Sequence, residues 1–306
     1  MKQLVFPSRG GRLCIGGVEI AIHAPENVRL HMENPHYRDF FGACEKSAHA
    51  DHLTIDLVCG DLPVIAEATR IFDTIDAWSL YRDRGGFWLR SPLAADQQPY
   101  WIARFESGAT RAELYIRTAG DDSRHEDTIL LPFSYPLDQL LLMYFLAARG
   151  GALVHAAGMI EADRAYLFAG VSGAGKSTFS ELLRAAKIRR LLSDERVVLR
   201  EGKNLITAFG TPWPGTSAIA ANDQAPLKGV FLLSHAGSNR VTKLEPVAAA
   251  DRLLPMLSIP WYDPETAAGV IAFIRRVAVV TPVYEFGFTP DAAAVEYLRG
   301  FLRETD

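Results

Sequence analysis

The sequence predicts an α/β protein in which a β-rich N-terminal domain precedes an α/β core. In the first part of the chain, apolar side chains recur with the two-residue period of strands, as in Leu53–Val58. After an apolar helix near residues 137–148, the order becomes strand, turn, strand, glycine-rich loop, helix and strand. We therefore expect two domains, residues 1–130 and 131–306.

The composition is that of an ordinary soluble globular chain. The 306 residues are 49% hydrophobic and 22% charged, with a formal net charge of −4, which does not indicate a basic nucleic-acid-binding surface. The N-terminus lacks the apolar core of a signal peptide, and residues 140–148 are too few to cross a bilayer. We expect a cytoplasmic protein that binds neither nucleic acid nor membrane. Cys14, Cys44 and Cys59 form neither a CxxC pair nor an even set and predict reduced thiols.

Several local patterns predict individual elements. Trp101–Phe105 and Ala112–Arg117 flank a turn that contains Gly108, which predicts a hairpin, and Gly85–Gly86 predicts a turn into the strand 87–89. The charged residues 121–127 predict a surface loop. Pro136 near the first turn and glycines after residue 149 bound a helix that is apolar nearly all round and therefore buried.

Further patterns follow the glycine-rich loop. We expect strands at 227–233, 241–244 and 279–288, and helices at 248–257, 267–276 and 290–302.

The glycine-rich loop carries the strongest functional signal. Residues 170–177, GVSGAGKS, match G-x-x-x-x-G-K-[ST] without a gap. Glycines let successive backbone N–H groups point at phosphate oxygens, the lysine brings a positive charge to the phosphates, and the serine hydroxyl can ligate Mg²⁺. The sequence therefore predicts a nucleotide site built from Gly170, Ser172, Gly173, Ala174, Gly175, Lys176, Ser177 and Thr178.

Two further features accompany the loop. Asp194 and Glu195 lie between apolar runs eighteen and nineteen residues after Lys176; one carboxylate can hold Mg²⁺ while the other accepts a proton from an attacking hydroxyl or water. The alternative is an exposed turn whose acidic pair contacts Arg196. His155 lies on an apolar strand, where the pattern alone favours a core histidine over a catalytic one.

Taken together, LVHAAGM, GVSGAGKST and LLSDERV resemble the C-terminal kinase domain of the HPr kinase/phosphorylase family. They also share the P-loop pattern of phosphoenolpyruvate carboxykinases. The resemblance covers roughly residues 150–300, and the general layout is similar to HPr-kinase-like proteins associated with peptide modification, including lasso-peptide kinases. A homo-oligomer would fit the family.

The resemblance implies a role for each matched residue. Lys176 and Ser177 would hold ATP phosphates and Mg²⁺, and His155 would lie beside the phosphates. Asp194 would deprotonate the acceptor hydroxyl, and Glu195 would occupy the second acidic position, near the metal. The chain departs from the family downstream, where FGTPWPG at residues 209–215 stands in place of an acidic metal-ligand motif.

Three functions are consistent with these features. The first is a Mg²⁺–ATP-dependent kinase acting on a serine-type hydroxyl of a peptide or protein, which the first domain would help to recognise. The second is the same chemistry on a small molecule such as a free amino acid or a sugar. The third is a nucleotide-gated binding protein with little transfer activity.

Two features outside the motifs have open roles. The 209–215 loop is either a substrate-facing lid, with Trp213 packing on a ligand, or a rigid turn. Arg275–Arg276 either contacts an anionic ligand or forms a solvated face.

Overall fold

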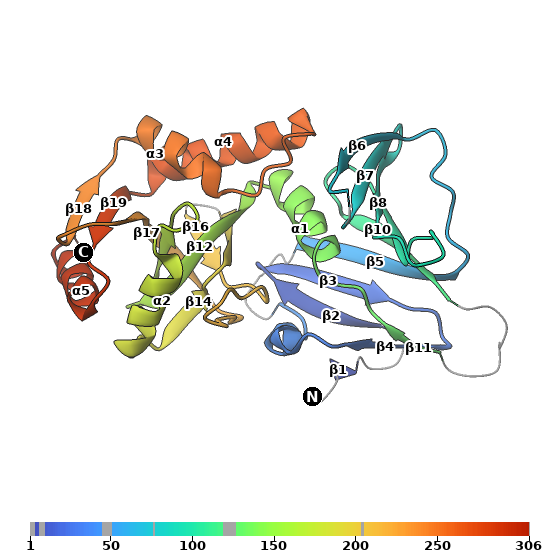
Figure 1. Cartoon of the computed structure of the whole chain (residues 1–306), viewed down its shortest axis with the longest axis horizontal. Helices are drawn as coiled ribbons and strands as arrows, with labels where there is room; N and C mark the ends of the chain where they lie inside the picture. The colour runs from blue at the N-terminus through green and yellow to red at the C-terminus, as the bar shows by residue number, and fades with distance from the viewer. Residues whose placement is uncertain are drawn as a thin grey trace. The chain divides into compact units, whose positions relative to one another are not determined.

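The structure is a computed structural model that describes residues 4–5, 10–44, 51–75, 77–118, 127–202 and 205–305. It mixes helices and strands in several sheets, as expected of an α/β protein (Figure 1). The chain divides into two compact units, Met1–Ala148 with Pro260–Pro264, and Arg149–Ile259 with Glu265–Asp306. Helix α1 (Leu137–Ala147) thus lies in the first unit, whereas the sequence placed it in a second domain beginning at residue 131. In the described part of the chain, no helix has both the length and the hydrophobicity of a membrane span.

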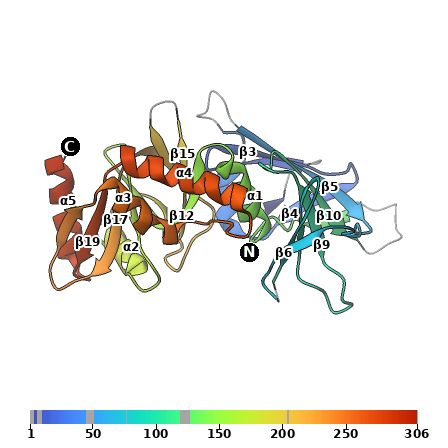
Figure 2. The same ribbon diagram turned by 90° about the horizontal axis from the view of Figure 1, so that it is seen from above.

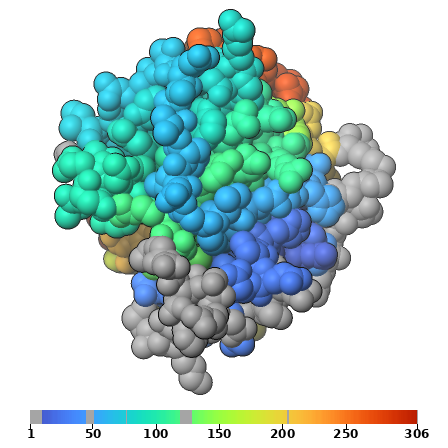
Figure 3. Space-filling view, turned by 90° about the vertical axis from the view of Figure 1, so that its right-hand side faces the viewer, coloured from blue at the N-terminus to red at the C-terminus, as the bar shows by residue number. Residues whose placement is uncertain are grey.

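The first unit is built on two sheets. The smaller has the order β1–β4–β11 and consists of β1 (Leu4–Val5), β4 (Val28–Met32) and β11 (Asp127–Leu130). The larger has the order β2–β3–β5–β10–β9–β8–β7–β6; among the described residues its β3–β5 and β5–β10 pairs are parallel and its other pairs antiparallel. Its strands are β2 (Gly10–Ile15), β3 (Val18–His23), β5 (Asp51–Gly60), β6 (Thr69–Asp73), β7 (Ser79–Asp83), β8 (Gly86–Arg90), β9 (Trp101–Phe105) and β10 (Arg111–Arg117). Residues of the first unit, in blue to green, make up most of the coloured face in Figure 3.

The strand patterns of the first unit are confirmed. Leu53, Ile55 and Leu57 alternate with more exposed residues along β5. β9 and β10 form the expected antiparallel hairpin, and β8 follows the turn at Gly85. The charged segment 121–127 lies outside the described residues except for Asp127, with which β11 begins.

The side chains of helix α1 are buried nearly all round. The ring of Tyr144 lies 4.7 Å from the ring of Phe87 and 5.2 Å from that of Phe105, measured between centroids. Near the start of the helix, Tyr37 of η1 (Pro35–Phe40) donates a hydrogen bond to the buried carboxylate of Asp138. The uniformly apolar sequence of this segment thus corresponds to burial on every face.

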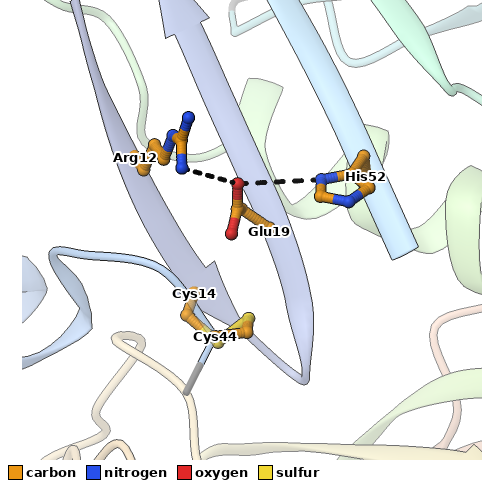
Figure 4. The surroundings of a disulfide bond; sticks show 5 residues. All are labelled: Arg12, Cys14, Glu19, Cys44 and His52. Atoms are coloured by element: carbon orange, nitrogen blue, oxygen red, sulfur yellow. Dashed lines mark ion pairs between the residues drawn. A yellow bond between two sulfur atoms is a disulfide. The ribbon is translucent and has the colours of Figure 1, made fainter. Parts of the chain in front are cut away.

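The expectation of three reduced thiols is wrong, because Cys14 and Cys44 form a disulfide (Figure 4). Cys14 lies on β2 and Cys44 follows η1, and the fold brings their Cα atoms to 5.2 Å. Cys59 remains a thiol. The bond joins residues 30 positions apart that share no local motif, so only the tertiary structure pairs them.

The second unit contains one large mixed sheet and the glycine-rich loop. The pairing order is β13–β12–β15–β16–β17–β19–β18, with β14 on β12, and β17 also pairs β13 in parallel. The strands are β12 (Gly151–Glu161), β13 (Arg164–Ala169), β14 (Arg190–Ser193), β15 (Arg196–Glu201), β16 (Ile206–Phe209), β17 (Gln224–His235), β18 (Arg240–Lys243) and β19 (Val283–Phe288). The predicted order of strand, turn, strand, loop, helix and strand is confirmed, with β12, β13, α2 (Lys176–Ala185) and β14 in those places.

Two helices pack on this sheet and enclose an aromatic core. Phe168 of β13, Phe231 of β17 and Phe286 of β19 are buried in one cluster with Phe179 of α2. The helix α5 (Ala292–Thr305) adds its apolar face to the same cluster and lies beside β19 in Figures 1 and 2. This core holds the strand that precedes the glycine-rich loop and the helix that follows it.

The remaining predicted elements are present, with boundaries that differ by a few residues. β17 and β18 correspond to the predicted strands 227–233 and 241–244, and α3 (Pro246–Leu253), η2 (Leu254–Met256), α4 (Pro264–Val280) and α5 correspond to the predicted helices, although α5 begins at Ala292 rather than at residue 290. The predicted strand 279–288 begins only at Val283, because Val279 and Val280 form the last turn of α4. Their valine side chains are typical of strands, but here they project into solvent from the helix end.

Candidate functional site

The glycine-rich loop, residues 170–175, joins the end of β13 to the start of α2. Gly175 is the N-cap of α2 in a left-handed conformation with φ of 96°, and no side chain caps the helix. The uncapped first-turn N–H groups and the helix dipole favour an anion at this end. A Cβ at Gly175 would lie 2.7 Å from Cζ of Phe288 and 2.9 Å from Cε1 of His235, so the loop passes too close to β17 and β19 for a larger residue.

Lys176 is held over the loop by the loop's own carbonyl groups. Its Nζ donates to the carbonyl oxygen of Gly170 at 2.7 Å and more weakly to that of Val171 at 3.4 Å. The side chain is buried, and this burial lowers the pKa of the Lys176 ammonium, while the nearby Glu195 carboxylate opposes the shift. The loop that would bind an anion through its N–H groups therefore also holds the Lys176 ammonium through its carbonyl groups.

His155 and Glu195 form a pair beside the loop. His155 is the last residue of β12 that pairs with β15, and the pairing of β12 with β13 on its other side begins at Ala156. Its Nδ1 is 3.1 Å from Oε1 of Glu195 and 3.0 Å from the Glu195 carbonyl oxygen. Both partners accept hydrogen bonds, so Nδ1 carries the hydrogen and Nε2 is the ring nitrogen that remains for another group.

This pair sets the charge of Glu195. The hydrogen bond from His155 lowers the pKa of the Glu195 carboxyl, burial acts in the opposite direction, and the charges of His155, Arg196 and Lys176 lower it further. The side chain of Glu195 is 37% exposed. Glu195 is therefore an ionised carboxylate that is accessible from the cavity.

Asp194 has a different environment from its neighbour. It is only 3% exposed, and three backbone N–H groups donate to its carboxylate, from Gly215 at 2.8 Å, Ser217 at 2.6 Å and Ile219 at 3.1 Å. Arg196 donates instead to Ser258 at 2.7 Å. The alternative of an exposed turn closed by Arg196 is therefore not supported.

A local turn explains why the two carboxylates diverge. The Oγ atom of Ser193, the last residue of β14, accepts hydrogen bonds from the N–H groups of Glu195 and Arg196, both at 3.2 Å. This side-chain turn bends the chain between β14 and β15, which both pair with β12. The bend sends one acidic side chain into the protein and leaves the next beside His155.

These groups share a cavity of about 340 Å³, a volume typical of small-ligand sites. Of the residues predicted for the site, those that line it are His155, Ser172, Gly173, Gly175, Lys176, Ser177, Thr178, Asp194 and Glu195. Gly170 and Ala174 do not line it: Gly170 supplies the carbonyl that holds Lys176, and the Ala174 N–H closes a turn on Val171 at 3.1 Å. The residues predicted from segments far apart in the sequence thus lie together.

Two residues at this site were not predicted from the sequence. His235 also lines the cavity, at the end of β17, with its ring centroid 5.4 Å from that of Phe288. Because β17 pairs in parallel with β13, the two strands end at the same edge of the sheet, where the glycine-rich loop begins. A polar residue just after the apolar run 227–233 could therefore have been predicted to lie near that loop. The other is Thr216, whose Oγ1 donates to Oγ of Ser177 at 3.2 Å, and no local pattern marks it.

The structure also places the 209–215 loop and the Arg275–Arg276 pair, whose roles the sequence left open. Trp213 is buried, and its carbonyl accepts a hydrogen bond from Ser193 at 3.4 Å, which favours the rigid turn over a ligand-stacking lid. Arg276 donates to Glu201 at 2.9 Å, and neither Arg275 nor Arg276 lines the cavity. This favours a solvated face for the arginine pair.

The donor set suits a nucleotide-bound Mg²⁺ better than a metal held by protein alone. Among the residues that the structure describes, no three His, Cys, Asp or Glu side chains are grouped to hold a metal ion. Mg²⁺ in proteins is commonly bound by one or two side chains together with substrate phosphates. The hydroxyl of Ser177 and the carboxylate of Glu195 line the same cavity and fit that pattern, while Asp194 is engaged by backbone N–H groups.

No protein-family model and no curated protein matches the chain.

Proposed function

We propose that the protein is a Mg²⁺–ATP-dependent kinase that transfers the terminal phosphoryl group of ATP to a serine-type hydroxyl on a peptide or protein. The observation that carries the proposal is the shared cavity, in which an uncapped helix N-terminus, a lysine and a hydroxyl meet a histidine–carboxylate pair. The first set suits a polyphosphate and the second an acceptor hydroxyl.

The chain's own groups would act as follows. Loop N–H groups and Lys176 bind the phosphates and compensate negative charge on the group being transferred. Ser177 and Glu195 would hold Mg²⁺, which supplies further charge neutralisation. His155 fixes the orientation of the Glu195 carboxylate through Nδ1. A carboxylate of the pair Asp194–Glu195 takes the acceptor proton, and the resemblance assigns that step to Asp194.

A macromolecular acceptor is supported by the first unit. Its large sheet forms a separate compact unit, while the residues lining the cavity all belong to the second unit. We infer that this separate unit provides the surface that recognises a peptide or protein acceptor.

The binding step is tested by titrating Mg²⁺–ATP into the purified protein and its Lys176→Met variant in a calorimeter. Loss of a charge-assisted contact of about 1.5–3 kcal/mol weakens binding by roughly 10- to 150-fold. Lys228→Met is the matched control, because Lys228 is exposed on β17 of the same unit. Equal affinity of the Lys176→Met variant and wild type would contradict the proposed nucleotide site.

The transfer step is tested with ATP labelled at the terminal phosphate. The protein is incubated separately with a serine-containing peptide library and with a mixture of free amino acids and sugars, and products are identified by mass spectrometry. Label on peptides supports the proposal, and label only on small molecules supports the small-molecule kinase. Binding of ATP with no labelled product and negligible hydrolysis indicates the nucleotide-gated binding protein.

A further inference from the structure

Residues 215–219 form a segment that is anchored on one buried carboxylate; we call it the 215–219 segment. Three of its five N–H groups, those of Gly215, Ser217 and Ile219, donate to Asp194. Two of them share Oδ1 and the third binds Oδ2. Charge-assisted bonds from backbone N–H groups are among the stronger hydrogen bonds in proteins. The carboxylate therefore fixes the conformation of a segment more than twenty residues away in the sequence.

The anchored segment also contacts the other elements of the site. Thr216 Oγ1 donates to Oγ of Ser177 at 3.2 Å, and Arg184 of α2 donates to the Ser217 carbonyl at 3.1 Å. A Cβ at Gly215 would lie 3.0 Å from Oδ2 of Asp194 and 3.2 Å from Oε2 of Glu195. The segment thus lies along Asp194, passes Glu195 at Gly215, and contacts α2 through Ser177 near its start and Arg184 in its last turn.

We propose that Asp194 is a positioning residue that holds the 215–219 segment next to the cavity, and that this segment presents the Thr216 hydroxyl, beside Ser177, to the terminal phosphate of the bound nucleotide. This inference rests on the proposed function. This role is additional to proton acceptance, because the three N–H bonds leave one of the roughly four acceptor positions of the carboxylate, on Oδ2, unused. It adds Thr216 as a ligand-contacting residue that the glycine-rich motif does not contain.

The first part of the proposal, that Asp194 holds the 215–219 segment, is tested without any ligand. Amide hydrogen exchange is measured in wild type and in the Asp194→Asn variant. The asparagine amide group presents N–H donors where the carboxylate had an acceptor, so at least one segment N–H loses its partner. We expect exchange of the Ser217 amide, or of the Gly215 and Ile219 amides, to become at least about 10-fold faster, a loss of roughly 1.4 kcal/mol of protection. Asp251→Asn removes the same charge from an exposed position on α3 and should leave these amides unchanged.

The second part of the proposal, that Thr216 contacts the terminal phosphate, is tested with variants that leave Asp194 intact. This test therefore does not depend on whether the Asp194→Asn variant folds. The Mg²⁺ complex of the imido analogue of ATP and, separately, AMP are titrated into wild type, Thr216→Val and Thr216→Ser. Because a neutral hydrogen bond contributes about 1 kcal/mol, Thr216→Val should bind the triphosphate analogue about 5-fold more weakly. AMP, which lacks the terminal phosphate, should bind all three alike, and Thr216→Ser should restore wild-type affinity.

The outcomes separate this inference from the proposed function. If wild type fails to bind the triphosphate analogue, the proposed function and the role of Thr216 both fall, and the exchange data alone decide whether Asp194 anchors the segment. If wild type binds it and Thr216→Val binds equally well, the 215–219 segment does not present this hydroxyl to the phosphate. Unchanged exchange of all three amides in a folded Asp194→Asn variant overturns the anchor.

Discussion

Replacement of Gly175 by alanine should destabilise the second unit through two separate effects, backbone strain and steric overlap. The residue has φ of 96°, and a left-handed conformation costs an L-residue about 1–2 kcal/mol. The added Cβ would also lie 2.7 Å from Cζ of Phe288, whose ring is fully buried against Phe179 at 5.2 Å between centroids. Because that ring cannot move aside, overpacking adds about 1–3 kcal/mol. We expect a total of about 2–5 kcal/mol.

Two other glycines provide controls for the separate contributions. Gly173 has φ of 82°, and a Cβ added there would meet no atom within 4 Å, so Gly173→Ala should incur only the conformational cost of about 1–2 kcal/mol. Gly237 is outside the left-handed region and equally open, so Gly237→Ala should change stability by no more than about 0.5 kcal/mol.

The assay is urea denaturation of the three variants and wild type, followed by circular dichroism. The free energies of unfolding should fall in the order Gly237→Ala, Gly173→Ala, Gly175→Ala, with the last the least stable. If Gly173→Ala and Gly175→Ala lose the same free energy, the contact with Phe288 contributes nothing. If Gly175→Ala is as stable as wild type, the close packing of the loop against β17 and β19 is refuted.

Three further predictions concern other parts of the molecule. Reduction of Cys14–Cys44, which closes a loop of 30 residues, should destabilise the first unit by about 3–4 kcal/mol on the chain-entropy model; a melting curve that does not change on adding reductant would contradict the disulfide. His155→Ala removes the hydrogen bond that lowers the pKa of Glu195, so the Glu195 carboxyl should titrate at higher pH in a carbon-13 NMR titration. A carboxyl group whose pKa is lower in the folded than in the unfolded state stabilises the fold at pH above the unfolded-state pKa. The difference in free energy of unfolding between wild type and this variant should therefore be largest at neutral pH and disappear as pH falls through the folded-state pKa of Glu195. A difference that does not depend on pH would exclude this coupling. Phe231→Ala should cost about 3–5 kcal/mol, measured by urea denaturation, because its buried ring stacks on those of Phe168 and Tyr284, and a loss under about 1 kcal/mol would show that the core repacks around the missing ring.

Local sequence patterns predicted the elements well, because the forces behind them act over a few residues. The alternation along β5 and the continuous apolar face of α1 follow from which side chains must be buried. The end of α4 shows the limit of such patterns. Val279 and Val280 suit a strand by propensity, but they complete the last turn of the helix, and local propensity does not decide between these alternatives.

Local sequence patterns likewise predicted one part of the candidate site and not another. The glycine-rich loop could be predicted because its wrapped backbone needs glycines at fixed spacing, and it lies between β13 and α2 as expected. The sequence could not show that Asp194 and Glu195 differ. That difference depends on the 215–219 segment, which binds Asp194, and on β12, which supplies His155 to Glu195.

The sequence by itself therefore determined the order of elements, the glycine-rich loop and the residue types at the candidate site, since each depends on neighbours a few positions away. The tertiary structure decided that Cys14 and Cys44 pair, that His235 lines the cavity and Thr216 contacts Ser177, and that Asp194 is engaged by backbone while Glu195 is accessible. These outcomes depend on which distant segments the sheets bring within hydrogen-bonding distance. Sheet pairing is set by burial of the whole core, and no local window of the sequence contains that information.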